Sequence, residues 1–245
     1  MVSEPLLPRI KNSFNRTNVL SLLVFLILAF FTVQMARISA AYIPYNTDVG
    51  FLRIKQQYIE IDHWRIAFFV HVYTSLWVLV AGFTQFSETI RSGYPKLHRV
   101  VGYVYAADIL FIAGPAGLIM GFYANGGITS RIAFIMLATG WIFFTAMAVV
   151  KARNGDYNSH RDYMMRSYAL TLSALTLRAW KWSINNSFEL PPMDVYRSVA
   201  WLGWVPNLLF AEFLIWRSKQ NAIKIRLAAR SAIGRSPLRR GDHGL

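Results

Sequence analysis

The sequence of 245 residues contains no cysteine. Disulfide bonds, iron–sulfur clusters, thiolate metal sites and cysteine nucleophiles are therefore excluded, and cysteine usage says nothing about the redox compartment. Charged residues are also scarce, at 16% of the chain against roughly 25% in soluble domains. The sequence shows no hydrolase triad, zinc-protease motif, phosphate loop or dinucleotide fingerprint. These absences disfavour a hydrolytic or nucleotide-driven enzyme.

Acidic residues are few, because 12 Asp and Glu stand against 26 Lys and Arg, which gives a net charge of +14. A soluble protein this basic would suggest a nucleic-acid partner. Here the basic residues lie at the ends of apolar stretches and in the C-terminal tail, and no base-reading or single-strand-binding motif is present. An anionic lipid surface is therefore the better partner for the basic tail, and no nucleic-acid partner is expected.

Hydrophobic residues make up 55% of the chain and lie in long blocks rather than at amphipathic spacing. About twenty apolar residues suffice to cross a bilayer as a helix. The sequence therefore predicts an all-α membrane protein, a bundle of six transmembrane helices. The six predicted spans are residues 19–36, 64–86, 100–123, 132–150, 164–183 and 199–216. Gly114 and Pro115 predict a bend within the third of them.

Lys and Arg gather in alternate connections, and this bias sets the orientation of a membrane protein. Both termini are therefore predicted to be cytoplasmic. Residues 1–18 form a basic cytoplasmic leader, residues 19–217 the transmembrane domain and residues 218–245 a basic cytoplasmic tail. The first apolar stretch is too long for a signal peptide, which favours an uncleaved anchor. Within the tail, residues 222–227 could form a short basic helix on the membrane surface, with a solvated disordered tail as the alternative.

Two histidines are the first candidates for chemistry. His98 and His160 each open a predicted span on the cytoplasmic side, and each is followed by an arginine. Ionisable side chains in a membrane are costly and usually functional. Two histidines at one level on facing helices could be the axial ligands of haem b, or could bind a metal. The alternative is that both are ordinary interfacial residues at the headgroup boundary.

His71 lies inside the second predicted span, about 10 Å below the outer surface at about 1.5 Å per residue. Most of the bilayer separates it from His98 and His160, so it is a possible further site. Met136 lies at a comparable depth and could be a second haem ligand there. The alternative is a neutral imidazole that hydrogen-bonds a hydroxyl such as Ser75, or a facing helix.

Polar residues inside the predicted spans form a second set of candidates. Asp108 lies near the middle of the bilayer, and Glu212 lies near the cytoplasmic boundary. Two buried carboxylates could form a proton path with the histidines. Alternatively, Asp108 is protonated and Glu212 pairs with a basic residue such as Arg166. The other polar intramembrane candidates are Gln85, Arg178 and Asn207.

Four segments carry a resemblance to a known family: GFTQF at 82–86, LHRVVGYVY at 97–105, HRDYMMRSYALT at 160–171 and TLR at 176–178. Together they resemble a family of predicted bacterial multi-pass membrane proteins, the domain of unknown function twenty-three-oh-six, over about residues 58–212. The resemblance implies residence in the bacterial inner membrane and marks these motif residues for testing. It implies no substrate or activity.

Three functions stay open at this point, and whether the protein is an enzyme stays open with them. The first is a haem- or metal-binding redox or electron-transfer membrane protein, which is favoured because His98 and His160 share a level. The second is a small transporter or proton-conducting protein that uses Asp108, Glu212 and the histidines. The third is a non-catalytic accessory subunit whose polar residues bind the helices of a membrane complex.

Overall fold

The computed structural model describes residues 16–234, and no strand occurs among them. Four helical segments are long and apolar enough to cross a membrane. These are α3 (Asp62–Gln85), Pro95–Phe122, α7 (Ile128–Arg153) and Pro192–Leu227. The all-α membrane class is therefore confirmed, and the number of six spans stays a prediction.

The first and fifth predicted spans do not belong to these four segments. Helix α1 (Arg16–Ala40) packs against α3, and Phe25–Ala40 forms an apolar stretch within it. The fifth predicted span is divided, because α8 (Tyr157–Thr171) stops at Leu172 and α9 (Ser173–Ser187) begins directly after it.

The third predicted span is interrupted where its glycine and proline predict a bend. It consists of α5 (Pro95–Asp108), the π-helical turn η2 (Ile109–Ala113) and α6 (Gly114–Phe122). Proline has no N–H to donate to the preceding turn, so the ordinary helical ladder cannot continue through Pro115. The amide of Gly114 instead bonds the Ile109 carbonyl, five residues earlier. A Cβ at Gly114 would lie 2.1 Å from that oxygen, so only glycine fits.

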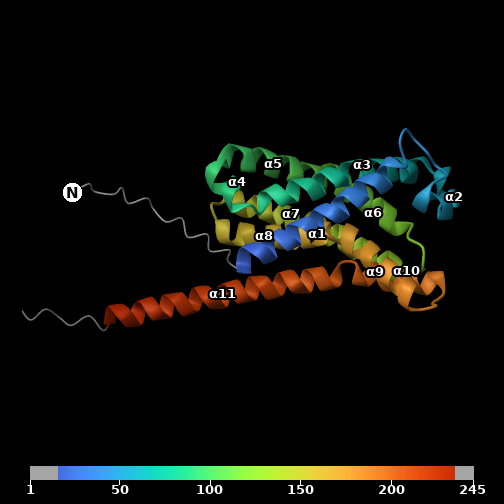
Figure 1. Ribbon diagram of the computed structural model, residues 1–245. Coiled ribbons are helices and arrows are strands. Elements are labelled where there is room, and N and C mark those ends of the chain that lie inside the picture. Colours follow the sequence, from blue (N-terminus) through green and yellow to red (C-terminus); the bar gives the residue numbers. More distant parts are fainter. Residues whose placement is uncertain (1–15, 235–245) are drawn as a thin grey trace, which may run out of the picture.

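Short helices complete the two ends of the bundle. Helix η1 (Gly50–Ile54) and α2 (Gln56–Ile59) join α1 to α3, and α4 (Glu88–Gly93) joins α3 to α5. Figure 1 shows α4 and the start of α8 at one end, and α2 with the α9–α10 turn at the other. These are called the His160 end and the Lys55 end.

The last helices are α10 (Pro192–Leu202) and α11 (Val205–Gly234). Figure 1 shows α11 running past the His160 end, which is also where α1 begins. The helix predicted at residues 222–227 is part of α11. Most of the predicted leader, residues 1–15, and the end of the tail, residues 235–245, lie outside the described residues.

The main core lies around the π-helical turn and contains Tyr105, Ile109, Trp141 and Tyr168. The outward faces are apolar as well; Phe111, for example, is 77% exposed. Apolar exposure of this kind suits helices that face lipid rather than water. The polar side chains of the spanning helices are therefore free to gather inside the bundle.

The Lys55 end is closed by a buried lysine. Lys55 is only 1% exposed, its ammonium donates a hydrogen bond to the carbonyl of Tyr123, and it lies 4.5 Å from the ring centre of Tyr58. This contact ties the connection between α1 and α3 to the turn between α6 and α7. Burial, followed by the charge of Arg131, lowers the pKa of Lys55 from 10.5 to about 8.

The stability of the protein is expected to rise between pH 8 and pH 10.5, and Lys55→Met is expected to remove this rise. In that window the folded chain has released the Lys55 proton while the unfolded chain still binds it, so alkali favours the folded state. The difference amounts to at most about 3 kcal/mol. Denaturant unfolding of both proteins in detergent across this pH range measures it. Parallel pH profiles for the two proteins would contradict the expectation.

Candidate functional site

His98 and His160 lie together at the His160 end. Each is the fourth residue of its helix, α5 and α8 respectively. The two imidazoles are close enough for their charges to interact. The structure therefore brings the two histidines to the same end of the bundle, and their shared depth in a membrane stays a prediction.

The two rings differ in their hydrogen bonds. Nδ1 of His160 donates to the carbonyl of Ala148 on α7 at 2.8 Å. A carbonyl only accepts, so Nδ1 holds a proton, and in the neutral ring the lone pair lies on Nε2. Nδ1 of His98 is buried and has no hydrogen-bond partner. Buried polar atoms without a partner are rare and call for an explanation such as a bound group.

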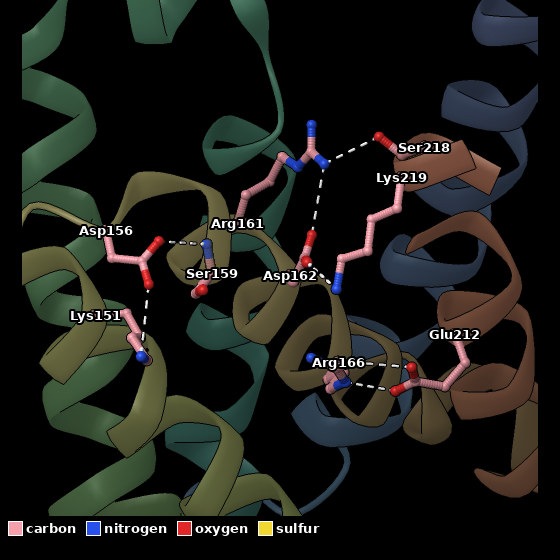
Figure 2. Close-up of polar contacts among 9 residues, drawn as sticks. All are labelled: Lys151, Asp156, Ser159, Arg161, Asp162, Arg166, Glu212, Ser218 and Lys219. Atoms are coloured by element: carbon pink, nitrogen blue, oxygen red, sulfur yellow. Dashed lines mark hydrogen bonds and ion pairs between the residues drawn. The ribbon is translucent and has the colours of Figure 1, made fainter. Parts of the chain in front are cut away.

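The start of α8 is fixed by Asp156, which precedes its first residue. The carboxylate of Asp156 accepts a hydrogen bond from the amide of Ser159 at 3.1 Å, as helix-capping residues do (Figure 2). The hydrogen bonds from Ser159 are the main reason that the pKa of Asp156 lies below its usual value. This cap determines where His160 enters the bundle.

The donor set at this pair suits a haem better than a lone metal ion. Within residues 16–234, no three His, Cys, Asp or Glu side chains gather as a metal site. Catalytic zinc and non-haem iron are usually held by three protein ligands. A haem needs only axial ligands from the protein, because the porphyrin supplies the other nitrogens. Two histidines match the number of axial ligands that a haem takes from a protein.

His71 forms a different environment on α3. Its Nδ1 donates to the carbonyl of Ala113 in the π-helical turn at 2.8 Å, and its ring lies 6.4 Å from that of Trp141. The predicted bond to a facing helix is found, and Ser75 is not the partner. Met136 is 49% exposed on α7, and a His71–Met136 haem pair stays a prediction.

Asp108 ends α5 directly before the π-helical turn and is 9% exposed. Its carboxyl group lies beside the hydroxyl of Thr74 and the backbone of Ala113. Its Oδ1 is buried and has no hydrogen-bond partner, and no described basic residue forms an ion pair with it. His71 and Asp108 thus both contact the backbone of the same residue, Ala113.

A buried network of hydroxyl groups lies between the two levels of histidines. The Tyr105 hydroxyl is 2.8 Å from Ser167 Oγ and 3.0 Å from Thr171 Oγ1. Trp141 Nε1 donates to Thr171 at 2.9 Å, and Thr145 is 2.7 Å from Ser167. This hydroxyl network was not predicted from the sequence. The four-residue spacing within the Ser–Thr and Trp–Thr pairs could have revealed it, because such residues share a helix face.

One face of α7 links the network to both levels. Trp141 contacts His71, Thr145 belongs to the hydroxyl network, and the carbonyl of Ala148 holds His160. Their spacing of four and three residues keeps them on one face of the helix. We call this series from His71 to His160 the polar column.

Ion pairs join α8 to α11 at the His160 end. Figure 2 shows Arg166 facing Glu212 with two contacts, one of them 2.8 Å long. The predicted pairing of Glu212 with Arg166 is confirmed. Asp162 is buried and pairs with Lys219 at 3.1 Å and with Arg161 at 3.5 Å. The pairs Arg166–Glu212 and Asp162–Lys219 connect α11 to α8, the helix that contains His160.

Replacing Glu212 with alanine is expected to destabilise the folded protein by about 1–2 kcal/mol, because the Arg166 guanidinium loses both contacts. Thermal unfolding in detergent measures the loss. Glu88→Ala is the matched control, because Glu88 is 86% exposed and 3.6 Å from Arg91. Such surface pairs contribute little, so the control should unfold like the wild type. Equal melting temperatures for all three proteins would contradict the expectation.

The remaining predicted polar residues form contacts of their own. Asn207 donates to Thr176 at 2.9 Å and to the carbonyl of Ala169 at 3.2 Å, so it bridges the break between α8 and α9. Gln85 lies against Gly102, where a Cβ would be 3.0 Å from its Oε1. Arg178 donates to Ala174 of its own helix. Asn207 and Gln85 thus contact neighbouring helices, whereas the bond of Arg178 lies within its own helix.

A family model described as a predicted membrane protein (DUF2306) matches residues 68–215. The chain therefore belongs to this family, as its sequence motifs predict. The matched region contains both histidine levels, the hydroxyl network and Glu212. No curated protein and no solved structure matches the chain.

Proposed function

We propose that this membrane protein binds a haem between His98 and His160 and transfers electrons. The observation that carries the proposal is the hydrogen bond from His160 Nδ1 to the Ala148 carbonyl. Histidines that ligate metals usually donate their second nitrogen to such an acceptor, which fixes the ring and leaves the other nitrogen free for the metal. The unpartnered Nδ1 of His98 beside it supports the same use.

The surroundings of His160 support a flat aromatic ligand. Tyr163, one turn further along α8, packs against Phe144 of α7 with ring centres 6.4 Å apart. The guanidinium of Arg166 lies 5.3 Å from the Tyr163 ring and 5.9 Å from that of Phe144. A bound haem would supply one-electron chemistry. The chain would orient it through the two histidines and limit its contact with water.

The proposal extends to location. We infer six spans in the bacterial inner membrane, with both termini and the His160 end facing the cytoplasm. Basic residues on α11 beyond the bundle, such as Lys224 and Arg226, suit anionic lipids at that surface.

An absorption spectrum tests the haem proposal. Protein purified in detergent, after expression with haem supplied, should show a Soret band that responds to dithionite. A colourless preparation without bound iron would refute it.

We infer proton conduction as a second candidate function, because one observation favours it separately. The Oδ1 of Asp108 is buried without a partner at one end of the polar column. A charge without a partner is costly inside a membrane, so a carboxyl group here usually serves a proton or an ion. Proton flux into liposomes that contain the purified protein tests it, and flux equal to that of empty liposomes would refute it.

A further inference from the structure

A cavity of about 530 Å³ opens at the Lys55 end, between η1, the α6–α7 turn, α9 and the start of α10. This volume is in the range of sites for small ligands. Arg197 of α10 donates a hydrogen bond to the carbonyl of Gly126 at 3.0 Å and pairs with Asp194 at 2.9 Å. These contacts connect the α10 side of the cavity to the α6–α7 turn. The cavity is therefore a fixed feature of the fold, and it lies apart from the polar column.

Three polar side chains line the cavity without protein partners. They are Lys181 and Asn185 on α9 and Asn125 in the α6–α7 turn. Among residues 16–234, none of these side chains forms a hydrogen bond or an ion pair. One ammonium and two amides together suit an anionic group that accepts hydrogen bonds.

Apart from Tyr196, the other residues that line the cavity are apolar. Leu190, Met193 and Val195 line it, so a ligand could place hydrocarbon beside its anionic group. The neighbours of Lys181 in the sequence, Trp180 and Trp182, are 40% and 72% exposed. Exposed tryptophans are typical of the level of lipid headgroups. These features together describe a site for an amphiphile at the membrane surface.

We propose that this cavity binds the anionic headgroup of a membrane phospholipid. Lys181 pairs with the phosphate, Asn125 and Asn185 donate hydrogen bonds to it, and the first carbons of the acyl chains contact Leu190 and Met193. The site is independent of haem binding and of proton conduction.

Native mass spectrometry of the full chain in detergent tests the site, with phosphatidylglycerol as the probe. The wild type should retain this lipid more strongly than phosphatidylcholine or oleate. Lys181→Gln should weaken retention about fivefold, as expected for one cation near an anionic lipid. Lys96→Gln on α5, an exposed lysine at the His160 end, is the matched control for charge and should retain the lipid like the wild type.

A second variant fills the cavity and leaves the charge in place. Met193→Trp should weaken retention of phosphatidylglycerol, whereas Met136→Trp, which changes a similarly exposed methionine on α7, should not. Unchanged retention in both Lys181→Gln and Met193→Trp would overturn the proposal. So would equal binding of phosphatidylcholine, stronger binding of oleate, or an equal loss in Lys96→Gln.

Discussion

Replacing His160 with alanine is expected to abolish the Soret band of protein purified after expression with haem supplied. The variant loses the imidazole of the pair whose Nδ1 donates to a backbone carbonyl, the arrangement that presents Nε2 to a metal. His98 would remain as a single axial ligand at the entrance of α5, without the opposing ligand that holds the haem. His98→Ala is expected to have the same effect, and the absorption spectrum with a pyridine haemochrome assay measures both.

Two other histidines serve as matched controls for this experiment. His63 bonds the hydroxyl of Tyr123 at 2.6 Å at the Lys55 end, and His71 bonds Ala113. His63→Ala and His71→Ala should both keep the full haem content, because neither residue lies at the level of the pair. A full Soret band in the His98→Ala/His160→Ala double variant would contradict the proposed ligands. An equal loss in the His63→Ala control would show a general loss of folding instead.

The helices could be predicted from the sequence where long apolar runs determine them. The predicted span 64–86 corresponds to α3 (Asp62–Gln85), and the predicted span 132–150 lies inside α7 (Ile128–Arg153). The division of the fifth span at Leu172 could not be predicted, because neither glycine nor proline marks it. Asn207 of α11 bridges this break, and such a contact between distant segments is not visible in a local pattern.

The candidate site was predictable in part. Opposite charges at a similar predicted depth were enough to predict the pairing of Arg166 with Glu212. The acceptor for His71 was predictable only as a facing helix, because the Ala113 carbonyl is presented by a π-helical turn that the sequence marks merely as a bend. The Tyr105 network was missed because its hydroxyl groups lie within apolar runs and meet only across three helices.

Proton flux through the protein in liposomes is expected to fall to the level of empty liposomes in Asp108→Asn. Asparagine matches aspartate in size and can keep the contacts with Thr74 and Ala113, but it cannot bind and release a proton. Tyr105→Phe should also reduce the flux, because it removes two contacts of the hydroxyl network. A pH-sensitive dye inside the liposomes, read after a potassium diffusion potential is applied, measures the flux.

The groups that face Asp108 decide how this result is interpreted. His71 contacts Ala113 as Asp108 does, and Tyr105 lies about one turn before Asp108 on α5. Arg178 interacts electrostatically with His71. Glu212→Gln is the matched control, because it also neutralises a carboxylate of the described bundle, but one that already pairs with Arg166. It should conduct protons like the wild type, and wild-type flux in Asp108→Asn would contradict the proposed role of Asp108. Asp108 lies ten residues beyond His98 on α5, about 15 Å along the helix axis. Its replacement should therefore leave the Soret band unchanged. This result would separate proton conduction from haem binding.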